Sequence, residues 1–312
     1  MTQARGFFQE LLFAFEASYG ATATSGQYIK LPFNSLGLGS DEDFIQPNTI
    51  TGNRFDVEPV LGNISCGGSI TVPLDVRNIG YWLKLMMGEP VTTGSGTYTH
   101  TFTSSTTIPS ATIERGHPDI GSYHLFNGCK LNSMAFDFTK GQELVVSMNI
   151  LGKGETLGTT SVDGDPGEEV FNRFNAKGVS VTEGGGATTI IRNVSVNVSN
   201  ELDGEVYTLD GTGFRDSLPE AGFMVNGNYR ALFNDQALYT KMINNTETSL
   251  TVVVSDGTNS LTLQMDEIKY PRKMPEDNGA GVINLPVEFK SYSQDDADSP
   301  LTIILVNDVA SY

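Results

Sequence analysis

The spacing of apolar and polar positions predicts a strand, a short helix and further strands in the first half of the chain. Around Ile70 and Val72, apolar residues alternate with small polar ones, which is the period of a half-buried strand. A helical spacing of i, i+3, i+4 and i+7 follows, carried by Ile79, Trp82, Leu83 and Met86. Asp75 precedes this segment as a helix cap, Gly88 follows it as a stop, and alternation resumes over residues 98–102.

The next patterned segment predicts a β-hairpin. The runs 129–138 and 144–150 flank the turn residues Thr139, Lys140 and Gly141. Met134, Phe136 and Phe138 share one face of the first run, and Val146, Met148 and Ile150 share one face of the second. Each strand of the hairpin is therefore expected to direct one face toward a core.

The second half repeats this order of elements. Alternating valines predict a strand over residues 194–198, and Leu238 and Met242 have helical spacing. Four further strands are expected, at residues 250–254, 261–268, 282–289 and 301–306. A strand, a short helix and more strands thus occur twice, which favours an internal duplication into two similar modules.

Two irregular segments divide the chain. Residues 1–57 alternate short apolar pieces with Gly, Ser and Asp clusters, and we expect them to form an extended N-terminal arm that a partner orders. Residues 156–190 are rich in Gly, Asp and Glu, and are expected to be a linker with an incoming strand. The two β modules are then predicted at residues 58–155 and 191–312.

Composition agrees with a mainly β protein of two domains. The 312 residues are 38% hydrophobic and only 18% charged, with 34 glycines, which suits many short strands joined by tight turns. The net charge of −18 argues against a protein that grips phosphates, because such proteins gather Lys and Arg. The same charge also has a simpler interpretation, since it keeps a soluble protein dispersed.

The sequence contains no motif typical of catalysis or metal binding. The three histidines form no H-x-H or HExxH pattern: His100, His117 and His124. The acidic run 163–168 has part of the spacing of a calcium loop, but Pro166 and Gly167 break the ligand order, so an acidic linker is the preferred interpretation. We expect a protein that is not an enzyme and that holds no cofactor and no metal.

The cysteines and the apolar stretches indicate in which cellular compartment the protein is expected. Cys66 and Cys129 lie in strand-like sequence without metal-binding spacing, so free thiols are expected, while a disulfide between them stays open. Glu10 and Glu16 interrupt the apolar N-terminal stretch, and no segment approaches the roughly 20 apolar residues of a membrane helix. We therefore expect neither a signal peptide nor a membrane segment.

A series of short motifs, taken in order, resembles the tail tube proteins of long-tailed phages, that is, their major tail proteins. In the first half these motifs are Glu16–Gly20, Leu31–Phe33 (LPF), Ile50–Arg54 (ITGNR), Gly62–Gly68, Pro73-Leu74 and the helix ending at Gly88. In the second half they are Ile191–Leu202 (IRNVSVNVSNEL) and Phe223–Phe233. Each motif is short, and the resemblance rests on their order over most of the chain.

The resemblance implies two β-sandwich or barrel-like modules, each with a flanking helix, in a subunit that forms stacked and commonly hexameric rings. The rings would enclose a β-lined channel that conducts double-stranded DNA during ejection without specific binding. The implied partners are copies of this chain and other tail proteins, namely the tape measure, baseplate and terminator proteins. The implied location is the virion tail, assembled in the host cytoplasm. Which of the two modules lines the channel stays open.

Two sets of residues are candidates for these roles. The arm would cross to the next ring, with Phe33 and Phe44 as apolar anchors and Arg54 in the ITGNR motif. Acidic residues on or beside strands are candidates to face the channel and repel phosphates: Asp137, Glu143, Asp203 and Glu205. The alternative for each of these acids is a solvated surface carboxylate.

Other functions stay open at this point. A different virion structural protein, such as a baseplate, tail-terminator or decoration protein, would share the composition and much of the fold. A carbohydrate-binding β protein would need clustered exposed aromatic residues, and a hydrolase would need a spaced carboxylate pair, neither of which the sequence shows.

Overall fold

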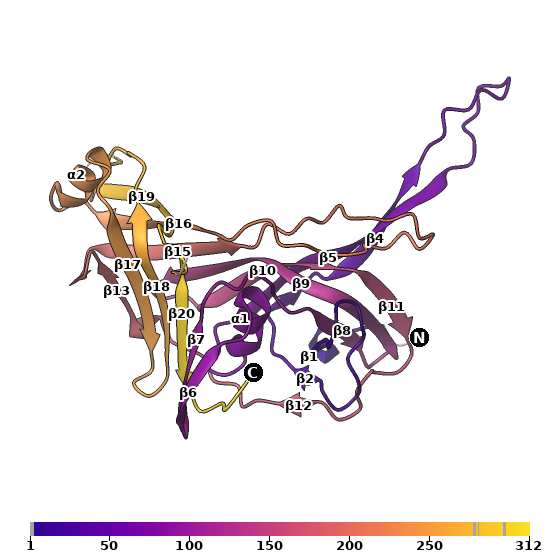
Figure 1. Cartoon of the computed structure of the whole chain (residues 1–312), viewed down its shortest axis with the longest axis horizontal. Helices are drawn as coiled ribbons and strands as arrows, with labels where there is room; N and C mark the ends of the chain where they lie inside the picture. Colours follow the sequence, from indigo (N-terminus) through magenta and orange to yellow (C-terminus); the bar gives the residue numbers. More distant parts are fainter. Residues whose placement is uncertain (1–2, 277–278, 280, 296–297) are drawn as a thin grey trace.

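The computed structural model describes residues 3–276, 279, 281–295 and 298–312, and within them the chain is mainly β. The described residues form twenty strands, two short α-helices, α1 (Ile79–Met87) and α2 (Ala237–Ile243), and two 3₁₀ turns at Gly6–Phe8 and Ala176–Gly178. The prediction of a mainly β fold is confirmed. Figure 1 shows the strands packed in layers over most of the long axis, with one hairpin projecting at one end.

One sheet gathers strands from the N-terminal part of the chain. Its order is β12, β2, β1, β8, β9 and β11, with bounds Gly167–Glu168, Ile29–Lys30, Glu10–Phe15, Ala111–His117, Ser122–Thr139 and Gly154–Gly158. All pairings are antiparallel except that of β12 with β2.

Strand β1 corrects the expectation that residues 1–57 form an arm. Leu11, Leu12, Phe13 and Ala14 are all buried, and β1 is hydrogen-bonded between β8 and β2. A strand covered on both faces needs a continuous apolar run, not an alternating one, and the sequence LLFAF has that pattern. Only a later part of residues 1–57 projects from the molecule.

A second, larger sheet continues from the other half of β9. Its neighbours run in the order β5, β10, β9, β15, β16 and β19, where the bounds of the new strands are Val60–Pro73, Val145–Gly152, Ile191–Ser199, Met224–Leu232 and Asn284–Ser291. The predicted hairpin is confirmed, since Met134 lies opposite Met148 and Phe136 opposite Val146 across β9 and β10.

A corner between β19 and β18 (Ser260–Lys269) joins this sheet to a further layer. There β18 pairs with β17 (Thr248–Ser255), which pairs with β13 (Val179–Glu183) and through it with β14 (Gly186–Ala187). On its other side β18 pairs with β20 (Thr302–Asn307), followed by β7 (Thr97–Phe102) and β6 (Val91–Ser95).

Gly128 marks the place where β9 passes from the first sheet to the second. Its φ of 61° lies in the left-handed region, and a Cβ built there would stand 2.6 Å from the Cβ of Lys153. Only glycine fits this bend without strain. Because one strand serves both sheets, the sheets cannot separate without breaking β9.

Helix α1 forms as its spacing predicts. Trp82 is buried and its ring lies 5.2 Å from that of Phe13, centroid to centroid, in an edge-on arrangement. The Asp75 carboxylate accepts hydrogen bonds from the backbone N–H groups of Arg77 and Asn78 just before the helix. Gly88, with a φ of 98°, ends it.

The two halves of the chain share one core. A single cluster of buried apolar side chains includes Leu11 and Phe136 from the first half and Val196, Tyr229 and Leu305 from the second. Strand β7 also pairs with β20, and β9 with β15, across the two halves. The division into two modules, at residues 58–155 and 191–312, therefore stays a prediction. In the structure the two halves pack together around a common core.

Candidate assembly surfaces

The projecting hairpin is formed by β4 (Gly39–Ile45) and the first part of β5, with β3 (Ser35–Leu36) beside its base. Figure 1 shows it extending beyond the rest of the molecule at one end of the long axis. Phe44 is 71% exposed and lies opposite Leu61, which is 58% exposed, while Ile45 lies opposite Val60. Large apolar residues held on an exposed hairpin mark an interaction site.

The arm candidates fall into two places. Phe44 and Arg54 both lie on the projecting hairpin and are exposed. Phe33 is half-buried and packs against the shared core instead. An exposed apolar surface was predicted for an arm over residues 1–57. In the structure the projecting hairpin carries this surface.

A long connection between β15 and β16 runs beside the base of the hairpin (Figure 1). Residues 200–223 fold back on themselves through two isolated bridges, Leu202 with Glu220 and Tyr207 with Arg215. The N–H of Ile64 in β5 donates to the carbonyl oxygen of Gly213 at 2.9 Å. We call residues 200–223 the ribbon.

Arg215 fixes the ribbon to β5. It is only 4% exposed, and its guanidinium donates to the carbonyl oxygens of Gly204 (2.7 Å), Cys66 (2.5 Å) and Gly152 (2.9 Å) and to the Ser65 hydroxyl (2.9 Å). A planar group with five N–H donors suits this set of backbone acceptors. Arg215 was not predicted from the sequence, because nothing in the neighbouring residues distinguishes it from a surface arginine.

Strand β6 is an open edge. It pairs with β7 alone among the described strands, and all five of its residues, VTTGS, are exposed. Edge strands of monomeric proteins are usually protected by charges, prolines or bulges, and this strand contains neither a charged residue nor a proline. It therefore offers a backbone edge to a neighbouring chain.

The outer face of the second sheet is polar but carries few charges. One row across it has Asp137 in β9, with Val145 of β10 opposite it on one side and Ser195 of β15 on the other. Beyond Ser195 the row continues to Asn228 in β16 and Glu288 in β19. The next row consists of Thr71, Ser147, Ala135, Asn197, Asn226 and the exposed Lys290. The opposite face of the same strands is buried and apolar. We call the outer surface the polar face.

The four acidic candidates do not lie together in one place. Asp137 is exposed in the middle of the polar face. Glu143, in the turn after β9, is bound at 2.6 Å by Arg173, so its charge is largely balanced. Asp203 and Glu205 are exposed on the ribbon. Asp137 is thus the candidate with the clearest position on a sheet surface.

Groups for other chemistry are scattered or buried in the described part of the chain. His100 is buried, and no group of three or more His, Cys, Asp or Glu side chains is placed to hold a metal ion within the described residues. Cys66 and Cys129 are buried free thiols in β5 and β9. Burial raises the pKa of the Cys66 thiol to about 12.

The comparison with protein families decides between the remaining alternatives. A family model described as phage tail tube protein matches residues 9–291. The chain belongs to the phage tail tube protein family. A comparison with curated proteins finds no match. Tail tube proteins are structural components of the virion, and they assemble with one another and with other tail components.

The matched region of this tail tube protein extends from the beginning of β1 to the end of β19. It includes the projecting hairpin, the ribbon and the polar face. Strand β20 lies beyond it but pairs with β18 and β7 inside the common core. Among the described residues, no helix is long and apolar enough to cross a membrane.

Proposed function

We propose that this tail tube protein polymerises as stacked hexameric rings around a channel, and that double-stranded DNA passes through that channel during ejection. The subunit acts by shape and surface chemistry, without a catalytic centre and without a cofactor. Its partners in this role are copies of itself and the tape measure, baseplate and terminator proteins of the tail.

The open edge of β6 is the observation that carries ring formation. An unprotected edge in a protein that assembles with itself is completed by a strand or loop of the next subunit. When the contact is head-to-tail, repetition of the same rotation closes a ring. The edge also explains why a chain with a complete core would still associate, since backbone N–H and C=O groups on that edge gain partners.

The projecting hairpin supports contact between successive rings. From Gly39 to Ile50 the chain has length for about 36 Å in extended form, at about 3.3 Å per residue. Phe44 and Leu61 would lose water contact on reaching a neighbour, which favours association. We therefore propose Phe44 and Arg54 as residues of the contact between rings. Phe33 packs against the core of its own chain and is not part of this contact.

The polar face has the chemistry expected of a channel wall. Its two rows contain one cation, Lys290, among uncharged and acidic residues, and one cation is no array that would bind phosphates, so DNA would meet little resistance. Asp137 adds a negative charge in the middle of this face. Asp203 and Glu205 would also repel phosphates if the ribbon lies at the channel. Glu143 would repel them less, because Arg173 balances its charge.

Electron microscopy of purified protein tests the proposal. Negatively stained samples should contain rings or tubes, and an averaged view along the axis should show sixfold symmetry with the polar face toward the lumen. Particles that remain monomeric at every concentration and in infected-cell lysate would contradict it. Rings with the polar face outside would overturn the assignment of the channel wall alone.

A further inference from the structure

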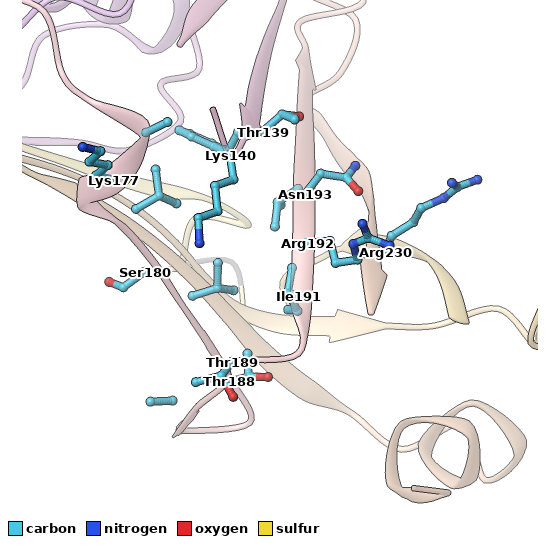
Figure 2. A pocket seen from close by; sticks show the side chains of 16 residues that line it. Thr139, Lys140, Lys177, Ser180, Thr188, Thr189, Ile191, Arg192, Asn193 and Arg230 are labelled. Atoms are coloured by element: carbon cyan, nitrogen blue, oxygen red, sulfur yellow. The ribbon is translucent and has the colours of Figure 1, made fainter. Parts of the chain in front are cut away.

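A groove opens at the end of the molecule opposite the projecting hairpin. It has a volume of about 960 Å³ and lies between β13 on one side and the ends of β9 and β15 on the other (Figure 2). Val179 and Val181 contribute one apolar wall, and Phe138 and Ile191 contribute the other. The groove therefore has two apolar walls that face each other.

The charged residues that line this groove are all basic. They are Lys140, Lys177, Arg192 and Arg230, and no Asp or Glu is among the described residues that line it. Figure 2 shows Lys140 pointing into the groove between its walls, while Arg192 and Arg230 extend from β15 and β16 away from its centre. In a chain of net charge −18, such a group of cations stands out from its surroundings.

Part of this positive charge is unbalanced. Arg230 lies 3.3 Å from Glu276, and Arg192 donates to the Asn284 side chain. The ammonium groups of Lys140 and Lys177 have no hydrogen bond or ion pair within the described part of the chain. These two lysines are free to bind an acidic partner.

The projecting hairpin has the complementary surface. Residues 41–61 include five acidic residues, Asp41, Glu42, Asp43, Asp56 and Glu58, against the single basic residue Arg54. Neighbouring residues of a strand point to opposite faces, so the pair Phe44 and Leu61 lies on one face of the hairpin and the pair Ile45 and Val60 on the other. A hairpin that is apolar on both faces matches a groove with two apolar walls.

The hairpin cannot reach the groove of its own chain. Figure 1 shows β4 at one end of the long axis and β13 and the beginning of β15 at the other. A contact between them joins two copies head-to-tail, and repetition of such a contact extends an assembly.

We propose that the groove receives the hairpin 41–61 of a second copy of this chain, with Lys140 and Lys177 binding its acidic residues. This inference rests on the proposed function and specifies the contact through which subunits join. Other tail proteins with an acidic hairpin are the alternative occupants, and the first test separates them because it uses the purified chain alone.

Charge reversal tests the contact. Lys140→Glu in the groove and Asp43→Lys in the hairpin should each raise the protein concentration needed for polymerisation about fivefold, and the two together in one chain should recover most of that loss. Lys290→Glu, which changes an exposed cation outside the groove by the same charge, is the matched control. Sedimentation and negative-stain microscopy measure the polymerised fraction.

Disulfide trapping tests the location directly. Glu42→Cys combined with Val181→Cys should give a ladder of covalently linked chains when assembled protein is oxidised, because Val181 forms part of the groove wall. The native Cys66 and Cys129 are fully buried and do not compete. Glu42→Cys with Asn228→Cys on the polar face is the control pair, and should give no ladder.

The outcomes distinguish the two proposals. Wild-type protein that forms no rings or tubes contradicts the proposed function. Wild-type tubes that form normally, combined with no effect of Lys140→Glu and no ladder from the groove pair, overturn this inference and leave the proposed function standing.

Discussion

At the scale of single residues, Arg215 shows how a charge is accommodated in the interior. Its guanidinium has no carboxylate partner among the described residues, and bonds instead to three carbonyl oxygens and one hydroxyl. Burial of an unpaired cation is costly unless its donors are satisfied, and four hydrogen bonds meet most of that demand. The result is a rigid link between the ribbon and the base of the projecting hairpin.

We predict that Arg215→Lys destabilises the protein by about 2–4 kcal/mol, because a lysine keeps the charge but cannot reach all four acceptors. Denaturant unfolding measures this change, and hydrogen exchange should show faster exchange of amides in the ribbon. Arg192→Lys, at an exposed position, serves as the control and should change the free energy of unfolding little. Equal effects of the two substitutions would contradict the role assigned to Arg215.

His100 gives a residue-scale prediction about pH. It is buried, with one ring nitrogen 2.8 Å from the Thr92 hydroxyl and the other 2.9 Å from the Val309 carbonyl oxygen. Burial lowers the pKa of His100 below its ordinary value of 6.5. The unfolded chain therefore binds a proton at a higher pH than the folded chain does, so stability is lost as the pH falls from 6.5 through the lowered pKa.

The expected result is a free energy of unfolding that is constant above pH 6.5 and declines below it, with a slope of at most about 1.4 kcal/mol per pH unit from this group. In His100→Gln the part of the slope due to this residue should disappear. Denaturant titrations of both proteins at several pH values measure it. An unchanged slope in the variant would show that other groups cause the decline.

At the scale of elements, regular periodicity was enough to predict α1 and the hairpin of β9 and β10. The apolar residues around Trp82 fit the helical period of about 3.6 residues and not the strand period of two, and those around Met134 fit the strand period and not the helical one. Strand β1 was missed because both its faces are covered, so its burial depends on partners that are distant in sequence. The projecting hairpin gives no periodic signal because neither of its faces meets the core of its own chain.

Strand β6 gives the prediction at this scale. Thr93→Lys places a charge in the middle of the exposed edge, which is a common means of preventing strand pairing between chains. The variant should fold normally, because Thr93 is exposed, and should form rings much less readily. Size-exclusion chromatography and microscopy measure assembly, and circular dichroism measures folding.

Thr258→Lys is the control for this experiment. Thr258 is exposed in the turn between β17 and β18, so a lysine there adds the same charge without occupying an edge strand. Rings that form equally well from both variants would exclude β6 from the contact between subunits.

At the scale of the whole molecule, three surfaces point in different directions from one core. The β6 edge is paired with β7, the projecting hairpin continues β5, and the polar face is the outer side of β5, β9 and their neighbours. Buried residues of these strands, Phe102 in β7, Ile70 in β5 and Phe136 in β9, belong to one core cluster. A rigid body with an open edge, an axial projection and a wall can repeat in two directions at once, around a ring and along a tube. Periodicity predicts such strands one by one, but their positions relative to one another depend on contacts between residues far apart in sequence.

The last prediction concerns the passage of DNA. Asp137→Lys changes the charge on the polar face by two units per subunit, and a ring repeats that change in every copy. At physiological salt the Debye length is about 8 Å, so a lysine near the DNA surface would attract phosphates with little screening. Tubes should still assemble, because Asp137 is exposed, while DNA ejection from variant particles should be slower and should recover as salt is raised.

Two companion variants separate charge from position. Asp137→Asn removes the acid without adding a cation. If attraction by the lysine slows ejection, Asp137→Asn should slow it much less than Asp137→Lys does. If loss of repulsion dominates, the two variants should slow ejection by comparable amounts. Asp266→Lys adds the same charge at an exposed position on β18, outside the polar face, and should leave ejection unchanged. Ejection that is equally slow in Asp137→Lys and Asp266→Lys would mean that net charge matters and that the polar face does not line the channel.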